Sequence, residues 1–303
     1  MAGIIELEPI DNSEESFAHG QDRVYAPIGD DSVKHSCRFA LWIALAGLIL
    51  GGFECNAAPA LAAENGSDLE TMRDIPLPAG AKQRVLYVRP ASPRGTIVML
   101  PGGSGEAGMD EEGSVSHGNN FVVRTRALWA AQGYATVIPD ALDGQNLRGL
   151  RSSPAYAQAV AAMVSFAHGE TPGPVFLLGT SQGSIAAMNG AAHPLGGSVA
   201  GVVLTESVSR ESKSGETVFD ASPGQVSVPA LIVANRDSAC RVAPAEDAPR
   251  IAAAMKQAPE VNIIYVQGGL TRSRPCGSLS PHGYLGIEPE IVAKIVTWLN
   301  AHR

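Results

Sequence analysis

The sequence has few cysteines, no internal repeats and only one long apolar run. Its four cysteines and seven histidines do not occur at the spacings of zinc ligands, so we expect no metal site. Lysine and arginine number 22 against 30 acidic residues, a net charge of −8. This balance leaves no basic surface for nucleic acid and excludes that class of partner.

The apolar run covers residues 39–53 and is 15 residues long, which is short for a membrane span. Lys34 and Arg38 precede it, and an Ala-Leu-Ala sequence follows at residues 60–62. These are the three regions of a secretory signal peptide. We therefore expect a signal peptide over residues 33–63 and a periplasmic or secreted protein. An uncleaved signal anchor is the alternative, and the only expected membrane contact.

Residues 1–32 do not fit the start of a signal peptide, because they hold eight acidic residues and one basic residue, Arg23. Our hypothesis is that synthesis starts nearer Val33; a disordered acidic extension is the alternative. Residues 64–303 carry 19 basic and 21 acidic residues and are therefore close to neutral. Their number suits a single domain with a well-buried core.

Apolar strand-like runs alternate with helical patterns after a polar lead-in at residues 64–82. Alternation of this kind predicts the α/β class, with a mainly parallel sheet and helices on both faces. The polar stretch 207–216, which lies between two expected strands, predicts a loop and not a helical insertion. We therefore expect no large lid over the site. The expected strands are 84–89, 96–100, 134–138, 175–180, 199–205, 229–234 and 261–266, and the expected helices are 119–132, 154–168, 183–192, 244–257 and 288–301.

The sequence Gly179-Thr-Ser181-Gln-Gly183 joins an apolar strand to an alanine-rich helix. It is the G-x-S-x-G pattern in a strand–turn–helix setting, which exposes a nucleophilic serine. The turn is so sharp that side chains at the two glycines would collide with the backbone. Ser181 is thus the candidate nucleophile, and the N–H of Gln182 a candidate donor to an oxyanion. An ordinary strand-to-helix turn is the structural alternative.

A second glycine-rich turn, Pro101-Gly-Gly103-Ser-Gly105, ends the strand of residues 95–100. Acyl transfer needs two donors for the oxyanion, and the second usually comes from a loop after an earlier strand. We expect the N–H of Gly103, or of Ser104 beside it, to be that donor. A plain loop is the alternative.

Two carboxylates follow later strands and compete for the role of the acid. Asp237 follows the strand of residues 228–234, and Glu206 follows the strand of residues 201–205. Working polar groups in an open α/β sheet lie at the carboxyl ends of strands. Asp237 is the preferred acid that orients the histidine, with Glu206 as its competitor. Either could instead be a solvated loop charge or a helix cap.

His282 lies in Ser-Pro-His-Gly-Tyr, after the last strand and before the final helix, so it is the candidate base. The chain order Ser181, Asp237, His282 is that of the α/β hydrolases. On these motifs, residues 84–302 resemble the α/β-hydrolase superfamily, closest to small lidless members of the dienelactone-hydrolase and esterase kind. Many relatives have His-Gly where this chain has Pro101-Gly102, and a serine nucleophile argues against dienelactone hydrolase activity itself.

Two of the cysteines lie near the candidate site: Cys240 is three residues after Asp237, and Cys276 is six residues before His282. If the loops of acid and base meet, these two thiols are close enough to form a disulfide. Such a bridge requires an oxidising compartment, in agreement with a signal peptide. Two free buried cysteines are the alternative.

Together these features predict an exported serine hydrolase that cleaves an ester or related acyl bond through an acyl-enzyme. This chemistry needs no cofactor and no metal. Without a lid, the expected substrate is an ester of modest size or one presented at a polymer surface. The alternatives are an acyltransferase, a thioesterase or a peptidase with the same triad, or a non-catalytic binding protein. The sequence indicates no oligomeric state.

Overall fold

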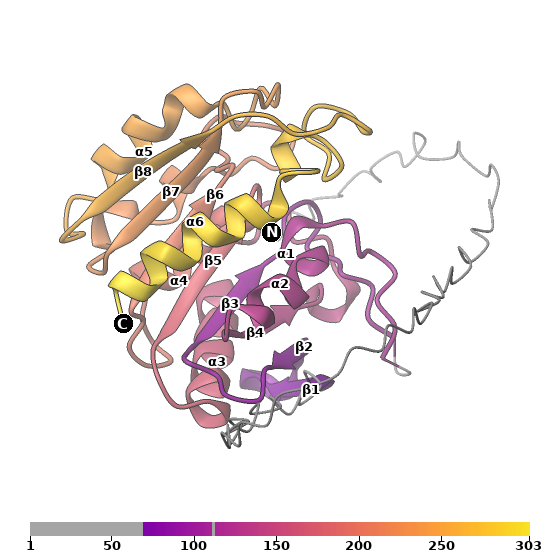
Figure 1. The fold of residues 1–303 in the computed structure, drawn as a ribbon. Coiled ribbons are helices and arrows are strands. Elements are labelled where there is room, and N and C mark those ends of the chain that lie inside the picture. Colours follow the sequence, from indigo (N-terminus) through magenta and orange to yellow (C-terminus); the bar gives the residue numbers. More distant parts are fainter. Residues whose placement is uncertain (1–68, 111–112) are drawn as a thin grey trace, which may run out of the picture. The chain divides into compact units, whose positions relative to one another are not determined.

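The computed structural model describes residues 69–110 and 113–303, so the predicted acidic extension and signal peptide lie outside the described residues. Eight strands form one sheet in the order β1-β2-β4-β3-β5-β6-β7-β8 (Figure 1). β1 and β2 pair antiparallel, as do β2 and β4, and the other neighbours are parallel. The strands are β1 Leu69–Pro76, β2 Lys82–Arg89, β3 Thr96–Leu100, β4 Ala135–Pro139, β5 Val175–Thr180, β6 Gly201–Thr205, β7 Ala230–Asn235 and β8 Val261–Val266.

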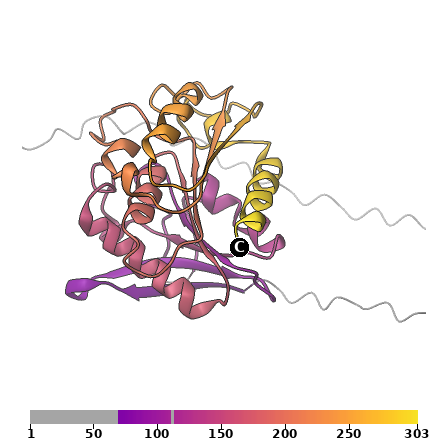
Figure 2. The ribbon, with the colours of Figure 1, turned by 90° about the vertical axis from the view of Figure 1, so that its left-hand side faces the viewer.

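Helices cover both faces of the sheet, as predicted (Figure 2). Those that pack on one face are α3 to α5, and those that pack on the other are α1, α2 and α6. The predicted helix 119–132 is two short helices, because the chain bends at Thr125 between them. The helices are α1 Phe121–Arg124, α2 Arg126–Ala131, α3 Pro154–Glu170, α4 Gly183–Ala192, α5 Ala248–Ala254 and α6 Glu288–Ala301.

The central strands are buried on both sides, which explains their continuous apolar sequences. Successive side chains of a strand point to opposite faces. In β5, Leu177 joins the core under α3 and α4, while Phe176 and Leu178 join the core under α2 and α6. The strand register thus divides one apolar run between two cores.

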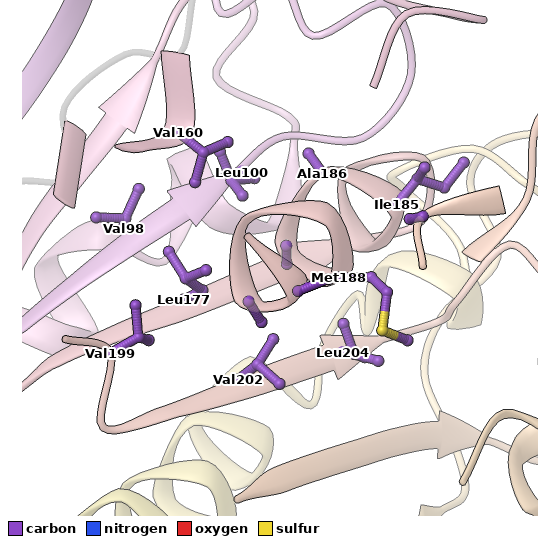
Figure 3. Packing of buried hydrophobic residues seen from close by; sticks show 14 of the residues in the cluster. Val98, Leu100, Val160, Leu177, Ile185, Ala186, Met188, Val199, Val202 and Leu204 are labelled. Carbon is purple, nitrogen blue, oxygen red and sulfur yellow. The ribbon is translucent and has the colours of Figure 1, made fainter. Parts of the chain in front are cut away.

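Helix α4 lies against β5 and β6 and is buried along its whole length. Figure 3 shows Ile185, Ala186 and Met188 of this helix among side chains of the sheet and of α3. Its small residues permit the close approach of α3: a Cβ atom on Gly190 would overlap Val160. This packing fixes the helix that begins directly after Ser181.

The segment between β6 and β7 holds two short 3₁₀ turns, Val218–Asp220 and Pro223–Gln225. No large lid covers the described part of the domain, as predicted from the polar sequence 207–216. Within residues 69–110 and 113–303, no helix has both the length and the apolar character that crossing a membrane requires. One prediction was wrong: residues 64–82 are not simply a lead-in, because β1 occupies residues 69–76 in the middle of that stretch.

Candidate active site

Ser181 occupies a strained turn between β5 and α4. Its φ angle is +52°, in the left-handed region where a non-glycine residue is costly by roughly 1–3 kcal/mol. A Cβ atom on Gly179 would overlap the carbonyl oxygen of Gly183, and one on Gly183 would overlap the carbonyl oxygen of Leu100. The backbone at both glycines therefore approaches neighbouring backbone as closely as the G-x-S-x-G pattern predicts.

His282 meets Ser181 across 101 positions of sequence, with its Nε2 atom 2.9 Å from the serine Oγ. The residue lies in a 3₁₀ turn, Pro281–Gly283, whose start is capped by Ser280: the His282 N–H donates to the Ser280 hydroxyl at 3.2 Å. Only 3% of His282 is exposed. The imidazole is therefore held in place at the hydroxyl of Ser181.

Glu206, and not Asp237, is the carboxylate beside the histidine. Its Oε2 atom lies 3.2 Å from Nδ1 of His282, and its Oε1 atom accepts the N–H of Asn235 at 2.6 Å. Glu206 is 2% exposed and has a φ angle of +47°. With Nδ1–H donating to Glu206, the Nε2 lone pair is available to accept the Ser181 proton.

The preferred sequence assignment of the acid is thus corrected. Asp237 is exposed, and its Oδ2 atom accepts the N–H of Gly268 at 2.7 Å. Asn235, at the end of β7, donates its side-chain amide to the carbonyls of Gly268 and Pro281, each at 2.9 Å. Asn235 therefore ties the histidine loop to β7, and Asp237 closes the turn beyond it rather than reaching the imidazole.

A signal for Glu206 was present in the sequence. β5 and β6 pair in parallel with Thr180 opposite Thr205, so Ser181 and Glu206 are the next residues on adjacent strands. The N–H of Ser181 donates to Thr205 O at 2.9 Å, which extends the ladder to the nucleophile. Glu206 follows β6, which is paired with β5, whereas Asp237 follows β7, which is one strand further from Ser181. Glu206 therefore starts closer to Ser181 than Asp237 does.

Tyr284 is completely buried and lies within the electrostatic influence of Glu206. Its hydroxyl donates to the carbonyl of Val233 at 3.0 Å. Burial raises the pKa of Tyr284 well above its ordinary value, and the negative charge of Glu206 raises it further. The phenol is therefore neutral next to the carboxylate at every ordinary pH.

Ser181 and His282 line a cavity of about 290 Å³, together with the two predicted oxyanion donors, Gly103 and Gln182. Gly102 lies close to Ser181: a Cβ atom there would lie 3.1 Å from Cβ of Ser181. Two arginines and no carboxylate belong to the lining. The remaining lining residues are Gly102, Asn120, Phe121, Arg148, Thr180, Val242, Arg274, Cys276, Gly277, Ser278 and Gly283.

The predicted disulfide is present: the sulfur atoms of Cys240 and Cys276 are 2.07 Å apart. Cys240 is buried, whereas Cys276 lies in the cavity wall. The bridge joins the loop after β7 to the loop that leads to His282. Among residues 69–110 and 113–303, no group of three or more His, Cys, Asp or Glu side chains is arranged to hold a metal ion.

Solved structures with 12–15% identity share this fold. A dienelactone hydrolase from Anabaena variabilis is 15% identical, with a TM-score of 0.52 over 78% of this chain and 98% of that chain. An esterase from Pyrococcus furiosus is 12% identical, with a TM-score of 0.56 over 78% and 91%. An acylaminoacyl peptidase from Pyrococcus horikoshii is 12% identical, with a TM-score of 0.53 over 78% and 42%.

No protein-family model matches the sequence, and no curated protein matches it either. The strand order, the helical layers and the similarity to these structures define the α/β-hydrolase fold. The chain has this fold without a large lid.

Proposed function

We propose that this protein is an exported serine hydrolase that cleaves a carboxylic ester through a covalent acyl-enzyme. The observation that carries the proposal is the alignment of Ser181, His282 and Glu206, with 2.9 Å and 3.2 Å between successive partners. A buried carboxylate, an imidazole and a hydroxyl in this order are the elements of nucleophilic catalysis. Export is supported by the signal-like sequence at residues 33–63 and by the disulfide.

In the first half-reaction, the Ser181 oxygen attacks the carbonyl carbon of the ester while Nε2 of His282 takes the hydroxyl proton. Glu206 holds the imidazole in the required tautomer and stabilises the imidazolium. The N–H groups of Gln182 and Gly103 are the proposed donors to the oxyanion. The intermediate then expels the alkoxide, which receives its proton from His282, and leaves an acyl group on Ser181.

In the second half-reaction, water attacks the acyl carbon and gives a proton to His282. The tetrahedral intermediate collapses, the proton returns to the Ser181 oxygen, and the carboxylic acid leaves. The atoms of one ester and one water are thereby distributed between an alcohol and an acid, and the enzyme returns to its starting state.

The cavity favours a small ester that carries an acidic group. A volume of about 290 Å³ admits a compact substrate, and the guanidinium groups of Arg148 and Arg274 face no lining carboxylate. Neither arginine forms an ion pair with any described residue. A carboxylate on the substrate would form a charge-assisted hydrogen bond with either guanidinium at the cavity wall.

The proposal is tested with a fluorophosphonate probe, which reacts with an activated serine. The wild-type protein should be labelled and should hydrolyse p-nitrophenyl acetate, and Ser181→Ala should lose both properties. Ser165→Ala is a control that should keep both properties, because Ser165 is exposed on α3 and does not line the cavity. A folded wild type that is neither labelled nor active would refute the proposal.

A further inference from the structure

Arg151 is a completely buried arginine that lies outside the three residues of the proposed triad. It precedes α3 and is 1% exposed. The buried amide of Asn189, on α4, donates to the carbonyl of Arg151 and to that of Ser153, each at 2.8 Å. The backbone of Arg151 is thus tied to the helix that follows the nucleophile.

The guanidinium of Arg151 holds the loop that carries the proposed oxyanion donor. Its Nη2 atom donates to Gly103 O at 3.1 Å and to Pro101 O at 3.3 Å. A Cβ atom on Gly105 would lie 3.0 Å from the same nitrogen, so the glycine leaves space for the guanidinium. One nitrogen therefore joins two carbonyls of the glycine-rich turn.

These contacts fix the direction of the Gly103 N–H. The C=O and N–H of a trans peptide point in opposite directions, because the unit is planar. The Gly102 carbonyl, which shares its peptide unit with the Gly103 N–H, accepts the N–H of Gly105 at 3.1 Å. Arg151 holds the carbonyls of the two flanking peptide units, so the unit between them cannot rotate freely.

The charge of Arg151 is not neutralised by contact. No carboxylate of the described residues lies within 4.0 Å of its guanidinium. Burial lowers the pKa of Arg151, while Tyr156 and Glu216 act in the opposite direction. Glu216 itself accepts the N–H groups of Gly149 and Ser152, at 2.8 Å and 3.0 Å.

An arginine stays protonated even when it is buried, so a positive charge persists behind the turn. Buried charges without an ionic partner are costly and therefore uncommon. A cost of this kind has a functional explanation if the charge faces a group that becomes negative only during the reaction.

We propose that Arg151 is a positioning residue of the oxyanion hole, which aims the Gly103 N–H and adds positive potential at the developing oxyanion. The inference rests on the proposed function, because it concerns the intermediate formed on Ser181. In this role, Arg151 stabilises the transition state and does not contribute to substrate binding.

The test compares Arg151→Met and Arg151→Lys with the wild type. In Arg151→Met, kcat should fall about 100- to 1000-fold, the range for loss of an oxyanion donor, with KM within about twofold. Arg151→Lys keeps the charge, but its ammonium ends one bond short of the Nη2 atom that binds both carbonyls, so its kcat should lie between the two. The inhibition constant of a boronic acid, which forms a tetrahedral anion on Ser181, should rise in step with the loss of kcat/KM.

Two controls separate this role from stability and from surface charge. Val164→Ala removes buried atoms of α3, and it should lower the melting temperature without changing kcat or boronic acid affinity. Arg210→Met removes a surface arginine bound to Asp247 and should leave the kinetics unchanged.

An Arg151→Met protein that is folded and has wild-type kcat overturns the inference while the proposed function stands. A folded wild type with no hydrolysis and no fluorophosphonate labelling overturns both. If neither variant folds, the wild type decides: boronic acid binding should shift the NMR signals of the Gly103 amide and the Arg151 guanidinium. An unshifted guanidinium signal in the inhibited enzyme would contradict the assignment.

Discussion

The carboxylate of Glu206 lies 3.2 Å from Nδ1 of His282, and it reaches the imidazole from the end of β6, the strand next to the nucleophile strand. The second oxygen of Glu206 accepts a backbone N–H from Asn235, so both oxygens are engaged. The proposed acid is thus fixed by the sheet itself and not by a surface loop.

The first prediction concerns this acid. Glu206→Gln should lower kcat by about 10³- to 10⁴-fold, because an amide in place of the carboxylate favours the wrong histidine tautomer. Asp237→Asn, which changes an exposed carboxylate that binds only backbone, should lower kcat less than about threefold. Steady-state kinetics on p-nitrophenyl acetate measure both values. The opposite ranking would return the role of the acid to Asp237.

The second prediction concerns the disulfide between Cys240 and Cys276. Reduction should destabilise the domain by roughly 3–4 kcal/mol on the chain-entropy model for a loop of this length, and the melting temperature should fall. Activity should fall as well, since Cys276 lies in the cavity wall near His282. Cys240→Ser/Cys276→Ser should match the reduced wild type and should not respond to reductant. An unchanged melting curve after verified reduction would contradict this expectation.

The third prediction concerns the two arginines of the cavity. Wild-type enzyme should prefer monoethyl adipate over ethyl hexanoate, which is similar in length but has no carboxylate. Arg274→Gln should raise KM for the acidic ester about tenfold, equivalent to ~1.4 kcal/mol, and leave KM for the neutral ester unchanged. Ester cleavage is followed by titration of the released acid, and Arg148→Gln is tested in parallel. Equal effects on the two esters would exclude an anion subsite.

The fourth prediction concerns Tyr284 and alkaline pH. Its folded pKa is raised above the ordinary value of 10.0, so the folded state keeps a proton that the unfolded chain releases. The stability that this proton contributes is present below pH ~10 and is lost as the pH rises further. In Tyr284→Phe, the decline above pH 10 should be shallower by up to about 1.4 kcal/mol per pH unit.

Urea unfolding at pH 7, 9.5, 10.5 and 11 measures the slope. Tyr284→Phe should also be less stable at pH 7, by about 1–3 kcal/mol, because the carbonyl of Val233 loses its buried donor. Tyr265→Phe is the matched control, since Tyr265 is 36% exposed. Identical alkaline slopes in wild type and Tyr284→Phe would show that another group is responsible.

Much of this architecture is predictable because its signals are local. The G-x-S-x-G pattern at Ser181 is required because a Cβ atom at Gly179 or Gly183 would overlap neighbouring backbone carbonyls. The central strands are predictable from their buried, uninterrupted apolar runs. The pairing of Cys240 with Cys276 was not a local signal: it was predicted from the meeting of the loops after β7 and before His282, and these loops do meet although Asp237 does not reach the imidazole.

The carboxylate beside His282 was predicted wrongly, because its position depends on how far the chain turns after its strand. Both Glu206 and Asp237 follow parallel strands, and what distinguishes them is that β6 pairs directly with β5 while β7 lies one strand further away. The side-chain amide of Asn235 binds Gly268 and Pro281 and ties the histidine loop to the end of β7, and the imidazole meets Glu206. β1 was missed for a similar reason: its polar sequence is stabilised by pairing with β2, which is a tertiary contact.

Two members of the proposed triad extend adjacent strands that share a hydrogen-bond ladder, whereas the imidazole lies on a separate loop that is held by the Asn235 amide, the Tyr284 hydroxyl and the disulfide. Insertions or deletions in that loop can therefore reshape one wall of the cavity while the hydroxyl and the carboxylate stay where the strands put them. Changes that alter substrate preference in this protein should therefore be tolerated best between Leu270 and Pro275, which lie before the disulfide at Cys276 and the cap at Ser280.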